Sequence, residues 1–302
     1  MLSAKQLSII VNKKTLLKNI DLDIKPGEVT ILLGCNGSGK STLLHALSGD
    51  FSQNHHSNGV KLSQLGCCEL DSQILSNYQP PELARRRAVM AQRIDRVFKY
   101  DAREFVKLGR YPYQNKSSVT SFKLKPQLTL SKFQTDENDI VNKALELADA
   151  TCLANRDITT LSGGEFARIQ FARALAQLWI DTPIHSYPKN KAAKNLLNAS
   201  YLLLDEPTAA LDLNQQHRLL ATSQMLSRKW GIGVFTIVHD INLAICYADN
   251  LAWLKAGELI AAGPAQDNFN AKLISEVLGY SVDIILREDL TPVAIPNKWV
   301  WP

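Results

Sequence analysis

The chain has 302 residues, which is enough for one large or two modest domains with a buried core. Its composition, with 45% hydrophobic and 21% charged residues, is that of a globular protein and excludes a disordered chain. The formal net charge of +5 is too small to indicate nucleic-acid binding by itself, and no apolar run approaches the roughly 18 to 20 residues that span a bilayer.

The first motif with a chemical meaning lies between a predicted strand and a predicted helix. A strand predicted at Leu7–Val11 opens the chain, and a second at Val29–Leu33 leads into a glycine-rich loop and a helix over about Gly39–Ser48. The loop comprises Gly34, Cys35, Asn36, Gly37, Ser38, Gly39, Lys40, Ser41 and Thr42. Its glycines let backbone N–H groups surround phosphate oxygens, while the lysine reaches the β- and γ-phosphates and the serine hydroxyl binds Mg²⁺. The motif predicts a nucleoside triphosphate site.

The middle of the chain is mostly helical in pattern. Within residues 93–157, the segment Asp136–Ala150 places an apolar stripe on one face of a helix, formed by Ile140, Val141, Ala144, Leu145 and Ala148. This pattern predicts a small helical subdomain inserted into the core. We expect three surface insertions, at Ser52–Asn77, Lys116–Ser131 and Asp181–Asn198.

A second motif begins at Ser162. Ser162 followed by Glu165 is a capping-box pattern, which predicts a helix from Ser162 to about Gln177. Gly163 and Gly164 leave the first N–H groups of that helix uncovered, so its positive end is suited to a γ-phosphate. An ordinary capping box before an amphipathic helix is the alternative interpretation.

Two carboxylates follow the next predicted strand. The buried-strand run Tyr201–Leu204 ends in Asp205 and Glu206, at the edge where open α/β sheets bind ligands. Asp205 is placed to hold Mg²⁺ beside Ser41, and Glu206 to polarise the water that attacks the γ-phosphate. Solvated acids at a strand end are the alternative.

Two single residues fit the same site. Gln92 follows the short apolar stretch Ala88–Ala91 and is a candidate contact of Mg²⁺ and the attacking water. His239 follows a predicted strand at Val234–Val238 and is a candidate γ-phosphate contact. With a further strand at Leu251–Leu254, the α/β alternation predicts a parallel sheet covered on both faces.

In this order, these motifs resemble the nucleotide-binding subunit of an ABC transporter, with TAALD after the two carboxylates as a further match. The resemblance implies an α/β fold: a P-loop NTPase core with a mostly parallel sheet, an N-terminal antiparallel β part and an inserted helical subdomain. The implied boundaries are 1–92 and 158–262 for the core, 93–157 for the helical subdomain leading into LSGGE, and 263–302 for a C-terminal helix and tail.

The resemblance also implies the cofactors ATP and Mg²⁺, and a head-to-tail dimer of two copies of the chain. In that dimer, residues 34–42 of one subunit hold ATP, and the other subunit covers it with Ser162, Gly163, Gly164 and Glu165. Asp212 communicates across the interface. The implied catalytic residues are Glu206, His239 and Gln92. The implied Mg²⁺ contacts are Ser41, Gln92 and Asp205.

A finer resemblance concerns the cargo. The segments Pro81–Gln92 and Gly109–Tyr113 are similar to importers of iron chelates, cobalamin and haem, and Ala174–Trp179 with the insertion after it is similar to hemin-import ATPases. This implies haem uptake, with a ferric siderophore or cobalamin as the alternative. A soluble ABC ATPase of DNA repair or translation is a further alternative, but the chain has neither a long coiled-coil insertion nor a second motif set.

The implied partners are integral membrane permease subunits and, indirectly, a periplasmic substrate-binding protein, with no nucleic acid. The implied location is peripheral, at the cytoplasmic face of the bacterial inner membrane. The candidate permease contact is a set of aromatic residues, each of which is alternatively part of the subdomain's own core: Phe98, Tyr100, Phe105, Tyr111 and Tyr113.

Three positions depart from the family pattern. No aromatic residue that would stack on adenine stands near Val11. Ala91 replaces a common proline before Gln92, and Phe166 follows LSGGE where a polar residue is common. None of these changes removes a predicted catalytic group.

Overall fold

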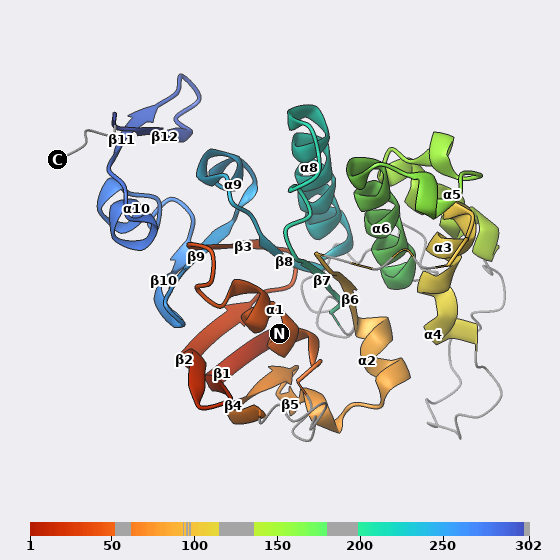
Figure 1. Cartoon of the computed structure of the whole chain (residues 1–302), viewed down its shortest axis with the longest axis horizontal. Coiled ribbons are helices and arrows are strands. Elements are labelled where there is room, and N and C mark those ends of the chain that lie inside the picture. The colour runs from red at the N-terminus through yellow and green to blue at the C-terminus, as the bar shows by residue number, and fades with distance from the viewer. Residues whose placement is uncertain are drawn as a thin grey trace.

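The computed structural model describes residues 1–51, 62–92, 94, 96, 98–114, 136–179 and 199–298. Within these ranges, no helix is both long and apolar enough to cross a membrane. The predicted insertions at Lys116–Ser131 and Asp181–Asn198 lie outside the described residues. Two sheets form the centre of the molecule, and helices cover the larger one (Figure 1).

The first sheet confirms the predicted antiparallel β part. Its order is β2-β1-β4-β5, with β1 at Leu2–Val11, β2 at Lys14–Ile24, β4 at Leu62–Leu70 and β5 at Gln73–Ile74. Asn12 and Lys13 join β1 to β2 with φ angles of 48° and 68°, as a tight hairpin of matching twist requires.

The expected surface insertion at Ser52–Asn77 is wrong for its second half. Strand β4 pairs with β1 in the sheet, and its Cys68 and Leu70 are buried in the core. Pairing with a strand about sixty residues away hides one side of β4, although the segment itself is rich in polar residues. A short 3-10 turn at Leu75–Asn77 then leads to α2, at Pro80–Arg86.

The second sheet confirms the predicted parallel core. Its order is β10-β9-β3-β8-β7-β6, and every pair is parallel except β9 with β10. The strands are β3 at Val29–Leu33, β6 at Arg87–Met90, β7 at Tyr201–Leu204, β8 at Gly233–Ile237, β9 at Asn250–Lys255 and β10 at Glu258–Pro264. The bounds of β3, β7, β8 and β9 agree with the predicted strands to within one residue at each end. We expected β6 only as an apolar stretch.

Alternate residues of this sheet face two different cores, as the period of two in a strand requires. Ile31 and Leu33 of β3 belong to the core that they share with three helices, α5 (Glu137–Leu147), α6 (Gly163–Leu178) and α8 (Leu213–Trp230). Leu32 belongs to the other core, between the sheet, α1 at Lys40–Ser48 and the antiparallel sheet. Both faces of the parallel sheet are therefore covered, as Figure 1 shows.

The helices lie mainly on one side of the parallel sheet (Figure 1). They are α3 at Ala102–Lys107, α4 at Tyr111–Gln114, α5 at Glu137–Leu147, α6 at Gly163–Leu178, α8 at Leu213–Trp230 and α9 at Ile241–Tyr247. Short 3-10 turns occur at Leu108–Arg110, Thr151–Leu153 and Ile158–Thr160. The stripe predicted on α5 is buried against α3 and α6, which confirms its helical period.

The C-terminal part contains α10 at Ala271–Leu278 and a hairpin of β11, at Val282–Leu286, with β12, at Pro292–Pro296. The hairpin contacts α9 through Asn242. Asn242 Nδ2 donates to the backbone oxygen of Ala294 over 3.0 Å, and Asn242 Oδ1 accepts from the N–H of Ala294 over 2.8 Å. A helix and a tail were expected here, and the hairpin departs from that expectation. Its strands are short, with β12 packed on α9 and β11 packed on α10.

Candidate nucleotide-binding and hydrolysis site

The glycine-rich loop connects the carboxyl end of β3 to the first turn of α1, and two of its glycines have no room for a side chain. A Cβ at Gly34, where φ is +155°, would lie 2.2 Å from the backbone oxygen of Leu254. A Cβ at Gly39, where φ is +105°, would lie 2.9 Å from the backbone oxygen of Leu16. Only glycine tolerates these positions. No side chain caps the start of α1, so its first N–H groups face the loop.

Lys40 lies buried beneath this loop. Its Nζ donates to the backbone oxygens of Gly34 and Cys35 over 2.8 and 2.9 Å. Burial lowers the pKa of Lys40, and the negative charge of Glu206 acts in the opposite direction. The ammonium group is therefore held against the loop that is predicted to bind phosphates, by carbonyl groups that a phosphate oxygen can replace as acceptors.

Asp205 and Ser41 meet at the end of β7. The Ser41 hydroxyl donates to Asp205 Oδ1 over 3.2 Å, and Asp205 is only 2% exposed. Burial raises the pKa of this carboxyl, and the neighbouring charge of Glu206 raises it further. A hydroxyl and a carboxylate are the oxygen ligands that Mg²⁺ prefers, and a cation would offset the unfavourable burial of the charge. The pair therefore fits a Mg²⁺ site.

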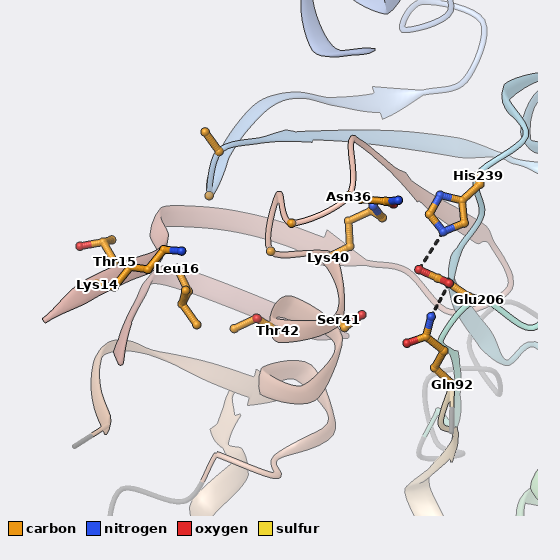
Figure 2. Close-up of a pocket in the computed structure, with 14 residues that line it drawn as sticks. Lys14, Thr15, Leu16, Asn36, Lys40, Ser41, Thr42, Gln92, Glu206 and His239 are labelled. Carbon is orange, nitrogen blue, oxygen red and sulfur yellow. Dashed lines mark hydrogen bonds and ion pairs between the residues drawn. The ribbon is translucent and has the colours of Figure 1, made fainter. Parts of the chain in front are cut away.

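Glu206 connects the other two predicted catalytic residues. Gln92 Nε2 donates to Glu206 Oε2, and His239 Nε2 lies 2.7 Å from Glu206 Oε1 (Figure 2). Glu206 has a φ of 49°, in the left-handed region that non-glycine residues seldom adopt. This backbone turns Glu206 toward the cavity, whereas Asp205, one residue earlier, contacts α1. Strain of this kind is concentrated at functional sites.

These residues line one cavity of about 730 Å³. The predicted residues on its wall are Asn36, Gly37, Gly39, Lys40, Ser41, Thr42, Gln92, Glu206 and His239. Figure 2 shows Gln92, Glu206 and His239 at one end of the cavity and Lys14, Thr15 and Leu16 of β2 at the other. Segments from six separate parts of the chain therefore meet around a space that is large enough for a nucleotide.

Sequence reasoning missed the far wall of the cavity. It consists of Lys14, Thr15 and Leu16 of β2 together with Ala256 and Gly257 of the turn between β9 and β10. No motif marks these residues, because tertiary contacts bring them to the loop. Among the described residues that line the cavity, none is aromatic, in agreement with the missing aromatic residue near Val11.

The structure does not bring the second motif into this cavity. Ser162 begins α6 with the predicted capping box: its Oγ accepts from the N–H of Glu165, and Glu165 Oε2 accepts from the N–H of Ser162. Asp212 caps α8 and accepts from the N–H of Gln215 over 2.8 Å. Neither segment is part of the cavity wall. One chain therefore holds the phosphate loop and the motif helix as separate surfaces.

The two segments outside the cavity contact each other. A Cβ at Gly164 would lie 2.7 Å from the backbone oxygen of Ala210, and one at Gly163 would lie 3.3 Å from the Cβ of Ala210. Packing within the subunit therefore requires glycine at position 164 and leaves little room for a side chain at position 163, apart from any role toward a nucleotide. The sequence indicated only the role toward a nucleotide.

The sequence of the chain is similar to a known protein family and to named relatives. The model of the ABC transporter family matches residues 17–178. The hemin import ATP-binding protein HmuV of Burkholderia lata is 42% identical, covering 98% of this chain and 100% of the relative. The protein of the same name from Hahella chejuensis is 37% identical, covering 94% and 93%.

Solved structures share the fold at lower identity. An inward-facing putative metal-chelate type ABC transporter aligns over 98% of this chain and 97% of its own, with a TM-score of 0.67 and 22% identity. The dimeric ABC transporter cassette MJ0796 aligns over 88% and 99%, with a TM-score of 0.62 and 24% identity. With the motifs, the fold and the full-length relatives in agreement, the chain belongs to the ABC transporter family.

Proposed function

We propose that this chain is the ATP-hydrolysing subunit of an importer that takes up haem. The observation that carries the proposal is similarity along almost the whole chain to relatives named hemin import ATP-binding proteins. Glu206 between Gln92 and His239 at the phosphate end of the cavity supports hydrolysis in addition to nucleotide binding. A ferric siderophore or cobalamin is the alternative cargo.

In the proposed mechanism, the loop binds the phosphates of ATP. Its backbone N–H groups and the N-terminus of α1 face the anion, and Lys40 exchanges its bonds to loop carbonyls for bonds to the β- and γ-phosphates. The base would occupy the end of the cavity that Leu16 of β2 lines. Binding therefore depends mainly on the phosphates, since the described wall offers no ring on which adenine stacks.

Ser41, Asp205 and Gln92 are the residues proposed to hold Mg²⁺. When bound, the ion neutralises charge on the phosphate oxygens. Asp205 is suited to this role because burial makes its charge unfavourable without a cation. Ser41 already contacts it, so the two ligands from α1 and β7 are preorganised.

Glu206 is proposed to orient and polarise the attacking water. One carboxylate oxygen is held by Gln92 and the other lies beside His239, so the direction of the group is restricted. His239 is placed to contact the γ-phosphate as well. Catalysis of this kind consists mostly of positioning and charge stabilisation.

Two copies of the chain are proposed to form two complete sites. The segment Ser162–Glu165, which we call the signature segment, does not reach the cavity of its own chain. Its glycines leave the positive end of α6 accessible to a γ-phosphate that a second copy holds. A solved relative of similar fold, MJ0796, has a dimeric structure, which supports this arrangement.

The permease contact is proposed on the exposed part of the helical region. Phe98 and Tyr111 are 70% and 68% exposed, and Tyr100 is also exposed. Phe105 is buried, and the centre of its ring lies 5.5 Å from the centre of the Phe166 ring, so it belongs to the subdomain's own core. The exposed rings suit a helix of a membrane partner, which would hold the chain peripherally at the cytoplasmic face of the inner membrane.

The domain boundaries are proposed as before: a core of 1–92 and 158–262, a helical subdomain of 93–157 and a C-terminal part of 263–302. Helices α3 and α5 pack on each other, which supports a helical unit, and both also pack on α6, which these boundaries assign to the core.

The proposal is tested by reconstitution. The chain is expressed with the permease subunits of a hemin importer and placed in vesicles. The nucleotide site faces Mg²⁺-ATP, and a substrate-binding protein is supplied on the opposite side. ATP-dependent hemin transport that the Glu206→Gln variant lacks is expected. Transport of cobalamin or of a ferric siderophore without hemin would replace haem as the cargo, and no ATPase activity in any assembly would contradict the enzymatic part.

A further inference from the structure

The C-terminal hairpin contacts the helix that begins just after His239. Asn242, on the first turn of α9, forms two hydrogen bonds with the backbone of Ala294 in β12, over 3.0 and 2.8 Å. A carboxamide carries the same kinds of donor and acceptor as a peptide group, so this one side chain satisfies both backbone polar groups of a strand residue. Ala294 is only 1% exposed. The start of α9 is therefore fixed to a buried position of the hairpin.

Asn242 is three residues from His239, and the segment between them is held tightly. Asp240 caps α9, and its Oδ1 accepts from the N–H groups of Asn242 and Leu243 over 2.8 and 3.0 Å. His239 directly precedes this cap, and its Nε2 lies 2.7 Å from Glu206 Oε1. Consecutive Cα atoms are a fixed 3.8 Å apart. A shift of the start of α9 is therefore passed on to His239.

The two ends of α9 are held by different elements. Tyr247 at its far end bonds to α8: its hydroxyl lies 2.8 Å from His217 Nδ1, and its backbone oxygen accepts from Gln224 Nε2 over 3.0 Å. The near end is held by Asn242 on the hairpin. With seven residues, α9 is too short to be stable without such contacts. Loss of the Asn242 bonds should consequently loosen the end beside His239 and leave the far end in place.

The C-terminal part is in turn connected to the phosphate loop. Strand β11 packs on α10 while β12 packs on α9, and Figure 1 shows these elements together at one end of the molecule. At the end of α10, the backbone oxygen of Val277 accepts from Cys35 Sγ over 3.3 Å. The backbone oxygen of Cys35 accepts from Lys40 Nζ over 2.9 Å. The C-terminal part therefore contacts the loop through α10 and the segment after His239 through the hairpin.

We propose that Asn242 is a positioning residue that holds His239 against Glu206 and toward the phosphate loop, with the C-terminal hairpin as its support. The inference rests on the proposed function, since it takes His239 to act beside Glu206 in hydrolysis. Asn242 does not line the described wall of the cavity, so it acts through Asp240 and His239. The hairpin, which no motif indicated, thereby has a part in catalysis.

The test compares Asn242→Ala with the matched control Asn268→Ala. Asn268 Nδ2 donates to the backbone oxygen of Pro264 over 3.0 Å, so its alanine variant loses a bond of the same kind in a different part of the C-terminal region. We expect Asn242→Ala to lower kcat about tenfold, as loss of two neutral hydrogen bonds predicts. The KM for ATP should stay within about twofold of wild type, because the phosphate loop is unchanged.

A double-mutant cycle shows whether Asn242 acts through His239. In a His239→Ala background, Asn242→Ala should change kcat by less than about twofold, since the residue that it positions is gone. Amide hydrogen exchange adds a measurement that needs no turnover. Bound ATP should slow exchange at residues 239–243 of the wild type. In Asn242→Ala that slowing should be lost, while residues 34–42 stay protected.

A kcat of Asn242→Ala that equals that of Asn268→Ala would overturn the proposal. A loss that is as large in the His239→Ala background as in the wild type would also overturn it. So would a raised KM together with a lower unfolding temperature, since both indicate a general loss of structure. If the wild-type chain does not hydrolyse ATP, the proposed function fails, whereas hydrogen exchange at residues 239–243 still decides the role of Asn242.

Discussion

Replacing Glu206 by glutamine is the sharpest test of the site. The substitution keeps the length and shape of the side chain and leaves an oxygen to accept from Gln92. It removes the charge that a general base needs. General-base catalysis contributes about 10²- to 10⁴-fold, so turnover should fall by that factor, equivalent to roughly 2.7 to 5.5 kcal/mol in the barrier.

Nucleotide binding should survive the same change. The negative charge of Glu206 raises the pKa of Asp205 and opposes the approach of an anionic ligand. Glutamine removes this repulsion, so ATP affinity should stay equal or rise. The variant should therefore accumulate as an ATP-bound dimer, because the step that reopens the site is blocked.

The assay measures phosphate release with Mg²⁺-ATP and the size of the protein by gel filtration. Glu146→Gln, an exposed position on α5 outside the cavity, is the matched control. Turnover by Glu206→Gln within about threefold of wild type, about 0.65 kcal/mol in the barrier, would refute the role of Glu206. A variant that stays monomeric with ATP would refute the trapped dimer.

Three further predictions address other parts of the site. Lys40→Ala should abolish both ATP binding and hydrolysis, because it removes the cation held at the loop; fluorescent-nucleotide binding at wild-type strength would contradict this. Ser162→Asp keeps a good N-cap but places a carboxylate toward the partner's γ-phosphate, so it should abolish hydrolysis while the monomer still binds ATP. Mixing this variant with Lys40→Ala should restore part of the ATPase activity. Loss of ATP binding by the Ser162→Asp monomer would place Ser162 in its own subunit's site. Burial raises the pKa of Asp205, so its ionisation lowers stability as pH rises above the unfolded value. Asp205→Asn should therefore raise the unfolding temperature of the nucleotide-free protein at neutral pH and reverse that order with Mg²⁺-ATP, and an unchanged temperature in both conditions would contradict it.

Features encoded within one stretch of chain were predictable from the sequence. The strand Val29–Leu33, the glycine loop after it and the helix after that form a continuous unit. The capping box at Ser162 needs only residues three positions apart. The two carboxylates follow directly from the end of a buried strand. In each case, local backbone conformation determines the geometry, so residue type and spacing suffice.

Other features required the tertiary structure. Strand β4 looked like a polar insertion until its pairing with β1 buried Cys68 and Leu70. The C-terminal hairpin depends on Asn242 of a different element. Pairings of this kind join positions far apart in the chain, and no local pattern records them.

The same distinction applies to the site. The sequence by itself determined which residues have the chemistry for phosphates, a metal ion and a water: Lys40, Asp205 and Glu206. Only the tertiary structure decided that Leu16 forms the far wall of the cavity and that Asn242 holds α9 on the C-terminal hairpin. Chemical identity belongs to each side chain, whereas a wall or a contact exists only after folding has brought distant backbone segments together.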